Sequence, residues 1–240
     1  MFCGNDIDKM FKASYHLSNI NVKQSNEGFK SELLQTLSEH LDYHHMLFWE
    51  MSNNELNAPV HFNIELNILN DYLHTYKHFD PLHPQNINTQ PSIQLMNKND
   101  AMCLQKQTHY KEVFLRENCY KDEMAMYLKV DNKLVAVIGF LRKIGEQSFN
   151  AKDVMRLVYL KKSIENMYAL HQYSQPSILL EMTAREREVL HFVCKGLKNA
   201  EIAQQLFVSE NTIKKHLQNL YRKFQVTNRT QLLARCWKYM

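Results

Sequence analysis

The pattern of apolar and polar positions predicts a mixed first part and an all-helical second part of the chain. Before residue 171, stretches with apolar residues at helical spacing alternate with apolar and aromatic runs that are typical of strands. Two such runs flank Asp131-Asn132-Lys133, so we expect a hairpin there. Helices combined with an antiparallel sheet predict an α+β domain. The expected helices lie near residues 31–41, 68–78, 101–116 and 150–173, and the expected strands near 43–51, 124–130 and 134–141.

A break in this pattern divides the chain. The last helix of the first part has Asn150 and Asp153 as capping residues and continues to about Tyr173. The polar segment that follows contains Pro176, which is typical of a linker. We therefore expect a first domain over residues 1–171, a linker over 172–177 and a second domain over 178–240.

The second part contains four short helical patterns. Thr183 followed by Glu186 is a capping-box pattern that opens the first helix, which ends near Gly196. Asn228 and Gln231 open the fourth helix in a similar way. The second and third helices are expected at about 199–206 and 210–224.

The third of these helices has two distinct faces. At about 100° per residue, its apolar residues fall on one stripe, which must face a core: Ile213, Leu217, Leu220 and Phe224. The opposite side carries amides, a hydroxyl and cations, which are the groups that contact base edges and phosphates in a major groove. These residues are Asn211, Thr212, Lys214, Lys215, Gln218, Asn219 and Arg222. The second helix, a short turn and this helix therefore predict a helix-turn-helix.

The charge of the chain is concentrated in the same part. Residues 176–240 carry 11 Lys and Arg against 5 Asp and Glu, a net charge of +6, whereas the preceding residues carry −2. A compact basic region is the electrostatic signature of nucleic-acid binding. A solvated surface with a chance excess of cations is the alternative.

Residues 180–236 resemble the LuxR-type, or GerE-type, helix-turn-helix domain of bacterial regulators. The matching stretches are Leu180–Leu190, Gly196–Ala203, Val208–Leu217 and Asn228–Thr230. Lys198 departs from the family pattern, which usually has Ser or Thr there, and Phe207 stands where a smaller residue is common. The resemblance implies that the third helix enters the major groove. The side chains then expected on bases are Lys214, Lys215 and Gln218, and those expected on phosphates are Asn199, Thr212 and Arg222.

The resemblance also implies a homodimer on a pseudo-palindromic site of double-stranded DNA. Members of this family usually dimerise through the fourth helix, where Leu233, Trp237 and Met240 offer apolar contacts. For Leu233, a place in the core of its own domain is the alternative.

The segment Tyr72–Leu82 resembles the Tyr-rich helix and Asp-Pro step of the GAF/PAS-like domain found upstream of this DNA-binding module. That domain is layered α/β/α, and in acyl-homoserine-lactone binders the matching Asp accepts a hydrogen bond from the ligand amide while aromatic residues line the pocket. The resemblance assigns these roles to Asp80, Tyr72 and Tyr76, with Phe48 and Trp49 on a pocket wall.

One departure concerns the ligand. The lactone binders carry Trp on or near that helix, and the two Trp of this chain, Trp49 and Trp237, do not fit. A different small molecule, or none, therefore stays open. A turn at Asp80-Pro81 with half-buried tyrosines in a core is the structural alternative.

Other classes of protein are not favoured. The sequence has no GxGxxG, P-loop or GxSxG pattern and no acidic cluster of a phosphorylated receiver domain. His74 and His78 are four residues apart, a spacing that suits one metal ion, but no HExxH motif, Cys pair or clear carboxylate ligand accompanies them. We expect no catalytic residue, metal or cofactor. An enzyme fused to a DNA-binding domain is a third alternative.

The same sequence predicts a cytoplasmic protein without membrane contact. No apolar run reaches the roughly 18 residues of a membrane helix, and the start lacks a secretory signal. The five cysteines are scattered, as in reduced proteins. We therefore predict a quorum-sensing-like transcription regulator whose DNA binding responds to a small molecule. The alternative is a regulator of this type controlled by dimerisation or a protein partner, without a ligand.

Overall fold

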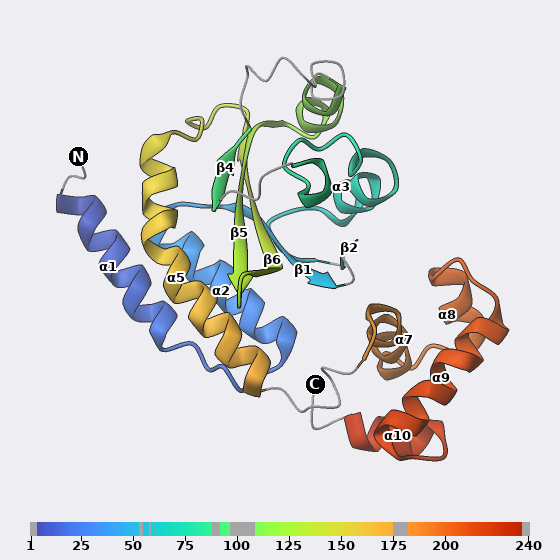
Figure 1. Ribbon diagram of the computed structural model, residues 1–240. Coiled ribbons are helices and arrows are strands. Elements are labelled where there is room, and N and C mark those ends of the chain that lie inside the picture. The colour runs from blue at the N-terminus through green and yellow to red at the C-terminus, as the bar shows by residue number, and fades with distance from the viewer. Residues whose placement is uncertain are drawn as a thin grey trace. The chain divides into compact units, whose positions relative to one another are not determined.

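The computed structural model describes residues 4–52, 55–57, 59–87, 92–96, 109–174 and 182–236. The chain divides into two compact units, Met1–His171 and Gln172–Met240 (Figure 1). In the first unit the helices are α1 (Gly4–Ser18), α2 (Asn26–Leu41), α3 (Leu66–Asp71), the π-helical turns η1 (Tyr72–Tyr76) and η4 (Tyr110–Leu115), the 3-10 turn η2 (Pro84–Asn86) and α5 (Ala151–Ser174). Its strands are β1 (His45–Ser52), β2 (Glu55–Leu56), β3 (Val60–Phe62), β4 (Ile93–Leu95), β5 (Tyr120–Val130) and β6 (Lys133–Lys143).

The strands form one antiparallel sheet in the order β2–β1–β6–β5–β4, with β3 also paired to β1. The long hairpin β5–β6 lies at its centre, with Met126 opposite Ile138. Its turn residues Asp131 and Asn132 have φ values of 50° and 60°, the left-handed pair that a two-residue hairpin turn needs. The predicted hairpin is therefore confirmed.

The period of two along the strands gives each face of the sheet its own core. Residues such as Met126 and Ile138 pack against α1, α2 and α5, whereas their neighbours Tyr127 and Val137 face α3, η1 and η4. Helices thus cover both faces of the sheet (Figure 1). The layered α/β/α arrangement expected for an α+β domain is confirmed.

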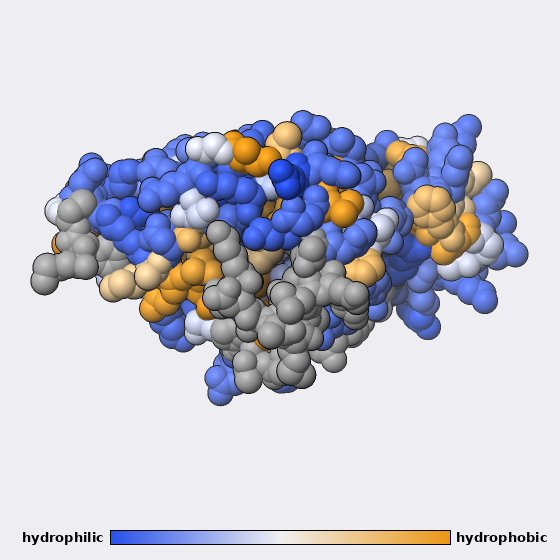
Figure 2. Space-filling view, turned by 90° about the horizontal axis from the view of Figure 1, so that it is seen from above, coloured by the Kyte–Doolittle hydropathy of each residue, from blue (hydrophilic) through white to orange (hydrophobic). Residues whose placement is uncertain are grey.

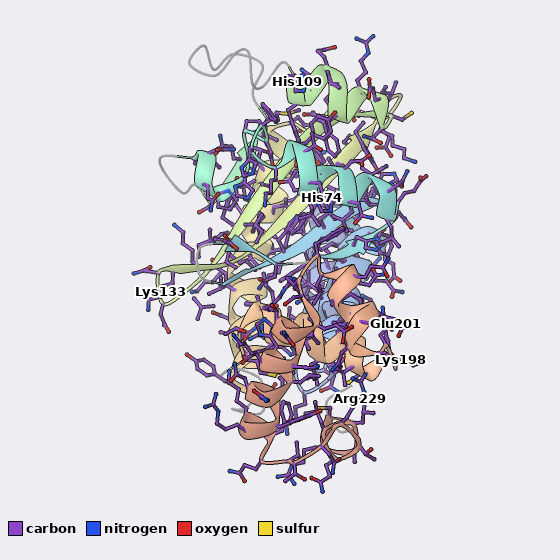
Figure 3. All side chains as sticks on the ribbon, turned by 90° about the vertical axis from the view of Figure 1, so that its right-hand side faces the viewer. His74, His109, Lys133, Lys198, Glu201 and Arg229 are labelled. Carbon is purple, nitrogen blue, oxygen red and sulfur yellow. The ribbon has the colours of Figure 1, made fainter. Side chains whose placement is uncertain are left out.

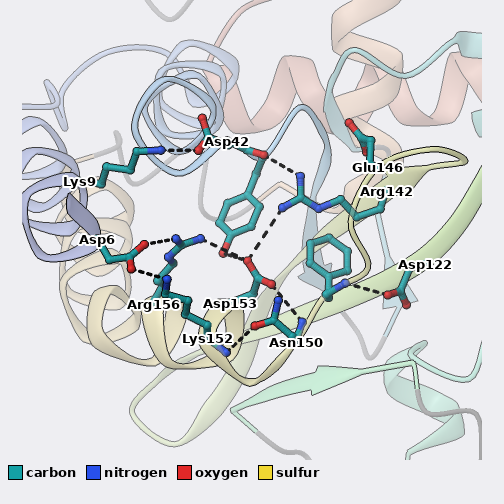
Figure 4. Close-up of polar contacts among 12 residues, drawn as sticks. Asp6, Lys9, Asp42, Asp122, Arg142, Glu146, Asn150, Lys152, Asp153 and Arg156 are labelled. Atoms are coloured by element: carbon teal, nitrogen blue, oxygen red, sulfur yellow. Dashed lines mark hydrogen bonds and ion pairs between the residues drawn. The ribbon is translucent and has the colours of Figure 1, made fainter. Parts of the chain in front are cut away.

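A buried polar network connects α1 to α5 and β6 (Figure 4). Asp6 forms ion pairs with Lys152 and Arg156 of α5. Asp153 accepts a hydrogen bond from the backbone N–H of Asn150 at 3.0 Å and lies 3.9 Å from Arg142. Asn150 and Asp153 therefore cap α5 as predicted, and the network provides the buried carboxylates with cations.

The first unit differs from the expected elements at four points. Helix α1 was not predicted, because only Met10, Ala13 and Leu17 mark its buried side. The helix expected at 68–78 begins at Leu66 and changes to the π-helical turn η1 at Tyr72. Strand β4, at Ile93–Leu95, was not predicted. Of the helix expected at 101–116, residues 101–108 lie outside the described part and 110–115 form η4.

The second unit has four described helices, as expected. They are α7 (Ala184–Cys194), α8 (Asn199–Gln205), α9 (Glu210–Phe224) and α10 (Arg229–Cys236). The capping box of Thr183 and Glu186 is present at the start of α7. Gly196, with a φ of 85°, ends that helix in the left-handed region, where a side chain would be strained. Helix α5 extends to Ser174, so the first three residues of the expected linker are helical.

None of the helices in the described ranges combines the length and apolar character that crossing a bilayer requires.

Candidate functional site

The first unit contains a cavity on the face of the sheet that packs against α3, η1 and η4. Residues of β1, β5 and β6 line it from the sheet side. Its walls are mostly apolar and aromatic, and the centre of a water molecule has about 40 Å³ in which to lie. At roughly 10–15 Å³ per water, this is room for about three waters. The aromatic members of the wall are Trp49, Tyr72, Tyr110, Phe114 and Tyr120.

Asp80 places a carboxylate at this cavity. The hydroxyl of Tyr72 donates to its Oδ2 at 2.7 Å, and the backbone N–H of Leu82 donates to its Oδ1 at 2.7 Å. Asp80 is buried, and burial raises its pKa to about 6 although these hydrogen bonds act in the opposite direction. The side chain is therefore held rigidly and titrates close to neutral pH.

Glu123 of β5 places a second carboxylate at the same cavity. The hydroxyl of Tyr110 donates to its Oε2 at 3.0 Å, while no described residue donates a hydrogen bond to Oε1. Burial raises the pKa of Glu123 well above its usual range, and the negative charge of Asp80 raises it further. A buried carboxylate with one hydrogen-bond donor among the described residues thus lies at the cavity wall, where a ligand group can approach it.

A hydrogen bond from strand β5 fixes the loop that carries Asp80 to the sheet. The hydroxyl of Tyr127 donates to the carbonyl oxygen of Leu82 at 2.6 Å. His83 also lines the cavity, and burial lowers its pKa to about 4. At neutral pH its imidazole is uncharged, so it brings no positive charge to the carboxylates.

The structure brings together three of the five residues proposed for ligand binding: Trp49, Tyr72 and Asp80 line the cavity. Phe48 does not, because it precedes Trp49 on β1 and therefore packs in the core on the opposite face of the sheet. Tyr76 lies outside the cavity wall, where its ring stacks on Phe114 at a centroid distance of 4.7 Å. Its proposed place in the pocket is corrected to a supporting position behind the wall.

Sequence reasoning missed Glu123 and Tyr110. Glu123 immediately precedes the predicted strand at 124–130. An acidic residue at that position is expected at the end of a strand, with its side chain in solvent. Glu123 is buried only because β5 begins at Tyr120 and pairs on both sides. Tyr110 reaches it from η4.

His74 and His78, the histidines singled out by their spacing, both lie in the described part of the chain. Within the described ranges, no three His, Cys, Asp or Glu side chains are grouped so that they could hold a metal ion. Figure 3 shows His74 on the η1 side of the first unit, and Tyr76 of the same turn stacks with His109.

The second unit presents helix α9 as its candidate nucleic-acid interface. Ile213, Leu217, Leu220 and Phe224 are buried, as predicted from their spacing. The N-terminus is capped by Ser209, whose hydroxyl accepts from the backbone N–H of Thr212 at 3.2 Å. Because one face of the helix packs in the core, the opposite face is directed outward.

The proposed DNA-binding side chains differ in their surroundings. Those of α9 expected on bases are exposed: Lys214, Lys215 and Gln218. Arg222 is exposed and donates to Asn219 at 2.6 Å, whereas Thr212 is half-buried and lies 2.9 Å from the hydroxyl of Ser209. Asn199 is half-buried at the start of α8, with its oxygen 3.5 Å from Arg229.

Arg229 connects the end of α7 to the start of α8 through hydrogen bonds. Its guanidinium donates to the carbonyl oxygens of Leu197 at 2.5 Å and Val193 at 3.3 Å. Figure 3 shows Arg229 near Lys198 and Glu201, where Glu201 accepts from the backbone N–H of Lys198 at 2.5 Å. These bonds satisfy carbonyls at the end of α7 and an N–H at the start of α8, and so orient the helix-turn-helix.

The residues proposed for dimerisation are only partly described. Leu233 is half-buried and packs against the core of the second unit. Trp237 and Met240 lie outside the described residues.

The architecture of the second unit is that of a DNA-binding transcription regulator, and the comparisons with known proteins agree. Residues 180–235 match the family described as bacterial regulatory proteins, luxR family. The monoamine regulon transcriptional regulator of Klebsiella aerogenes is 31% identical over 218 residues, which cover 88% of this chain and 92% of that protein. The chain therefore belongs to the luxR family of bacterial transcriptional regulators.

Solved structures share the fold of the whole chain. Escherichia coli SdiA aligns with a TM-score of 0.51 over 96% of this chain and 96% of that chain, at 16% identity. A structure of SdiA in complex with octanoyl-rac-glycerol aligns with a TM-score of 0.52 over 98% and 96%, at 17% identity. At these identities the likeness shows the fold alone.

Proposed function

We propose that this regulator binds a small organic molecule in the cavity of its first unit, and that the molecule changes the affinity of the second unit for DNA. The observation that carries the proposal is the cavity, with aromatic residues and the carboxylates of Asp80 and Glu123 at its wall. A largely apolar cavity with a few fixed polar groups is the usual form of a ligand site. The complex of SdiA with octanoyl-rac-glycerol supports it, because that protein shares the fold.

The proposed regulatory unit is residues 1–171, the DNA-binding unit is 178–240, and 172–177 joins them. In the DNA-binding unit, α9 enters the major groove of double-stranded DNA. Lys214, Lys215 and Gln218 contact bases, and Asn199, Thr212 and Arg222 contact phosphates. This activity belongs in the bacterial cytoplasm, where the chromosome lies.

A homodimer on a pseudo-palindromic site is part of the proposal. Helix α5 exposes apolar side chains on one side, and α1 exposes a second row. The residues of α5 are Met155, Val158, Tyr159, Leu170 and Tyr173, and those of α1 are Ile7, Phe11 and Tyr15. Orange apolar patches also interrupt the hydrophilic surface in Figure 2. Exposed rows of this kind mark protein contacts. Leu233 and Trp237 are the further contacts proposed for the second unit.

These rows also favour a second candidate function, in which a constitutive dimer or a protein partner controls DNA binding without a ligand. The two candidates differ in what the cavity does. A ligand shifts DNA binding only by its different affinity for the two states of the protein. In the second candidate, filling the cavity leaves regulation unchanged.

The test uses the full chain and a blocked cavity. Gly139 lines the cavity, and a Cβ added there has Leu47 Cβ as its nearest neighbour at an ordinary 3.9 Å. Gly139→Val is therefore expected to fold and to occupy ligand space. Preferred DNA sites are first selected from a random pool, and DNA affinity and melting temperature are then measured with small amines, alcohols, acyl lactones and acyl glycerols.

We expect at least one of these classes to raise the melting temperature and change DNA affinity in the natural chain but not in Gly139→Val. If no class changes either quantity, and Gly139→Val binds DNA like the natural chain, the ligand-independent candidate is the correct one.

A further inference from the structure

We propose that the ligand is a small organic cation, a primary ammonium on a short apolar group, held between the carboxylates of Asp80 and Glu123. This inference rests on the proposed ligand function and names the chemical class of the ligand. It goes beyond the role expected for Asp80 because it requires a second acid at the cavity and a positive charge on the ligand.

The first step is the distribution of cations around buried acids. The described residues include seven buried carboxylates, and five of them have a Lys or Arg nitrogen within 4 Å. These five are Asp6, Glu50, Asp153, Glu165 and Glu186. The remaining two, Asp80 and Glu123, are the two that line the cavity. The fold thus provides a counter-charge for every described buried acid except those a ligand can reach.

Glu50 shows what the missing partner is. It is 7% exposed, as is Glu123, and lies on the same sheet. Lys30 pairs with Glu50 at 3.0 Å, and Tyr168 also donates to it at 2.9 Å. Glu123 has the tyrosine, Tyr110, but among the described residues it has no cation. A buried anion is costly without a counter-charge, so a ligand ammonium in the cavity corresponds to the Lys30 ammonium.

The walls of the cavity suit an ammonium attached to an apolar group. The rings of Trp49 and Tyr72 lie 5.5 Å apart, and those of Tyr110 and Phe114 lie 5.3 Å apart. Aromatic faces attract cations and also bury an alkyl or aryl chain. The cavity has room for about three waters, which suits a short alkyl amine. A larger amine requires these side chains to move.

Binding of such a cation is coupled to loss of a proton. Burial and the charge of Asp80 raise the pKa of Glu123, which favours the protonated form of its carboxyl in the free protein. When an ammonium enters, it keeps its own three N–H bonds, and the O–H bond of Glu123 breaks and its proton passes to the solvent. The product is a carboxylate that accepts a hydrogen bond from the ammonium. A neutral ligand causes no such release.

The experiment is calorimetric titration of the full chain with n-butylammonium chloride and with 1-butanol, its uncharged counterpart, at pH 7.5 in MOPS and in phosphate, buffers that contain no primary ammonium. We expect the amine to bind at least about tenfold more tightly than the alcohol, because the added hydrogen bonds are charge-assisted. The amine heat is expected to differ between the buffers, which take up the released proton with different enthalpies. The alcohol heat is not.

The variant Glu123→Gln keeps an oxygen for Tyr110 and removes the charge. It is expected to bind the amine at least about tenfold more weakly and to lose the buffer difference. Glu112→Gln is the matched control, since Glu112 is an exposed acid of η4 that does not line the cavity. Melting temperatures show whether each variant is folded.

Equal affinity for amine and alcohol, or an unaffected Glu123→Gln, would overturn the amine proposal. So would a Ca²⁺ or Mg²⁺ titration in which the metal binds at the same carboxylates and displaces the amine. If a neutral compound instead changes DNA affinity and Gly139→Val abolishes that change, the proposed ligand function stands and the amine class alone is wrong.

Discussion

Lys223 of α9 and the buried Glu186 of α7 form an ion pair of 2.6 Å. It connects the helix proposed to contact DNA to the capping box of the first helix of its unit. The carboxylate of Glu186 also accepts from the backbone N–H of Thr183 at 2.8 Å. Burial opposes ionisation of Glu186, but the hydrogen bonds from Lys223 and Thr183 outweigh it and hold its pKa below the usual range. One side chain therefore fixes both the start of α7 and the position of α9.

The first prediction is that Glu186→Gln lowers the free energy of unfolding of the second unit by about 1–3 kcal/mol at pH 7, the cost of unpairing a buried charged group. Because the folded-state pKa is lowered, this contribution is complete above the unfolded-state pKa and is lost as pH falls through the folded-state value. Urea unfolding of the variant and the natural chain at pH 7 and pH 3 measures the difference.

Glu188→Gln is the control for that measurement. Glu188 pairs with Arg185 at 2.8 Å, but its side chain is 36% exposed, so its loss costs about 0–1 kcal/mol. If both variants lose the same stability, the connection between α7 and α9 through Glu186 has no special weight.

The second prediction separates base contacts from phosphate contacts on α9. Lys215→Ala is expected to weaken binding to the preferred DNA site about tenfold or more and to reduce the preference over unrelated DNA. Arg222→Ala is expected to weaken all sequences alike and to reduce the slope of log affinity against log salt by about one. Fluorescence anisotropy over a salt series gives both quantities.

Lys195→Ala removes an exposed cation beyond the end of α7 and controls for the change in net charge. A salt slope that falls equally for Lys195→Ala and Arg222→Ala would show a general charge effect. A Lys215→Ala variant with unchanged sequence preference would remove that residue from the base contacts.

The elements of the second unit follow closely from local sequence signals. The four helices are marked by Thr183, Ser209 and Asn228 as caps and by Gly196 as a stop, and each signal acts within a few residues. The first unit depends on pairing between distant strands. The change to π-helix at Tyr72 has no comparable local mark.

The candidate ligand site divides in the same way. Tyr72 and Asp80 are eight residues apart, and the resemblance of a single segment was enough to identify them. Glu123 lies at the same cavity because strand β5 places it there. Phe48 lies on the opposite face of the sheet, because successive side chains of a strand point to opposite faces. Such relationships arise from strand register, which the linear pattern of this chain does not reveal.

The third prediction is that Glu123→Gln stabilises the ligand-free protein at pH 8. Because burial raises the folded-state pKa of Asp80 and Glu123, the contribution of these two groups to stability is greatest at low pH. It is lost as pH rises through the folded-state values, which for Asp80 is about 6. An amide in place of Glu123 removes one buried acid, with an expected gain of about 1–3 kcal/mol. The other titratable groups that line the cavity are Tyr72, His83, Tyr110 and Tyr120.

Thermal melts at pH 5 and pH 8 test this prediction. The stability at pH 8 relative to pH 5 is expected to be higher for Glu123→Gln than for the natural chain. Glu112→Gln, which changes an exposed acid, is expected to behave like the natural chain. A loss for Glu123→Gln at pH 8 would mean that the carboxylate is compensated in the ligand-free state.

The fourth prediction concerns the exposed row on α5. Val158 is 54% exposed and Tyr159 is 57% exposed, next to Met155 one turn earlier. A Glu at position 158 places a charge in the centre of this row, where burial against a second copy would leave it unpaired. We therefore expect Val158→Glu to raise the dimer dissociation constant at least about tenfold without lowering the melting temperature of the monomer.

Sedimentation velocity over a range of concentrations measures the dissociation constant of the dimer. The effect on DNA binding is measured by comparing the affinity for selected DNA with two half-sites and with one. Lys133→Glu, at the exposed turn of the β5–β6 hairpin, is the control for an added acid on the same unit. Val158→Glu is expected to lose the advantage of a two-half-site DNA over a single half-site, whereas Lys133→Glu keeps it. An unchanged dissociation constant in Val158→Glu would place the dimer contact elsewhere, with Leu233 and Trp237 of the second unit as the next residues to substitute.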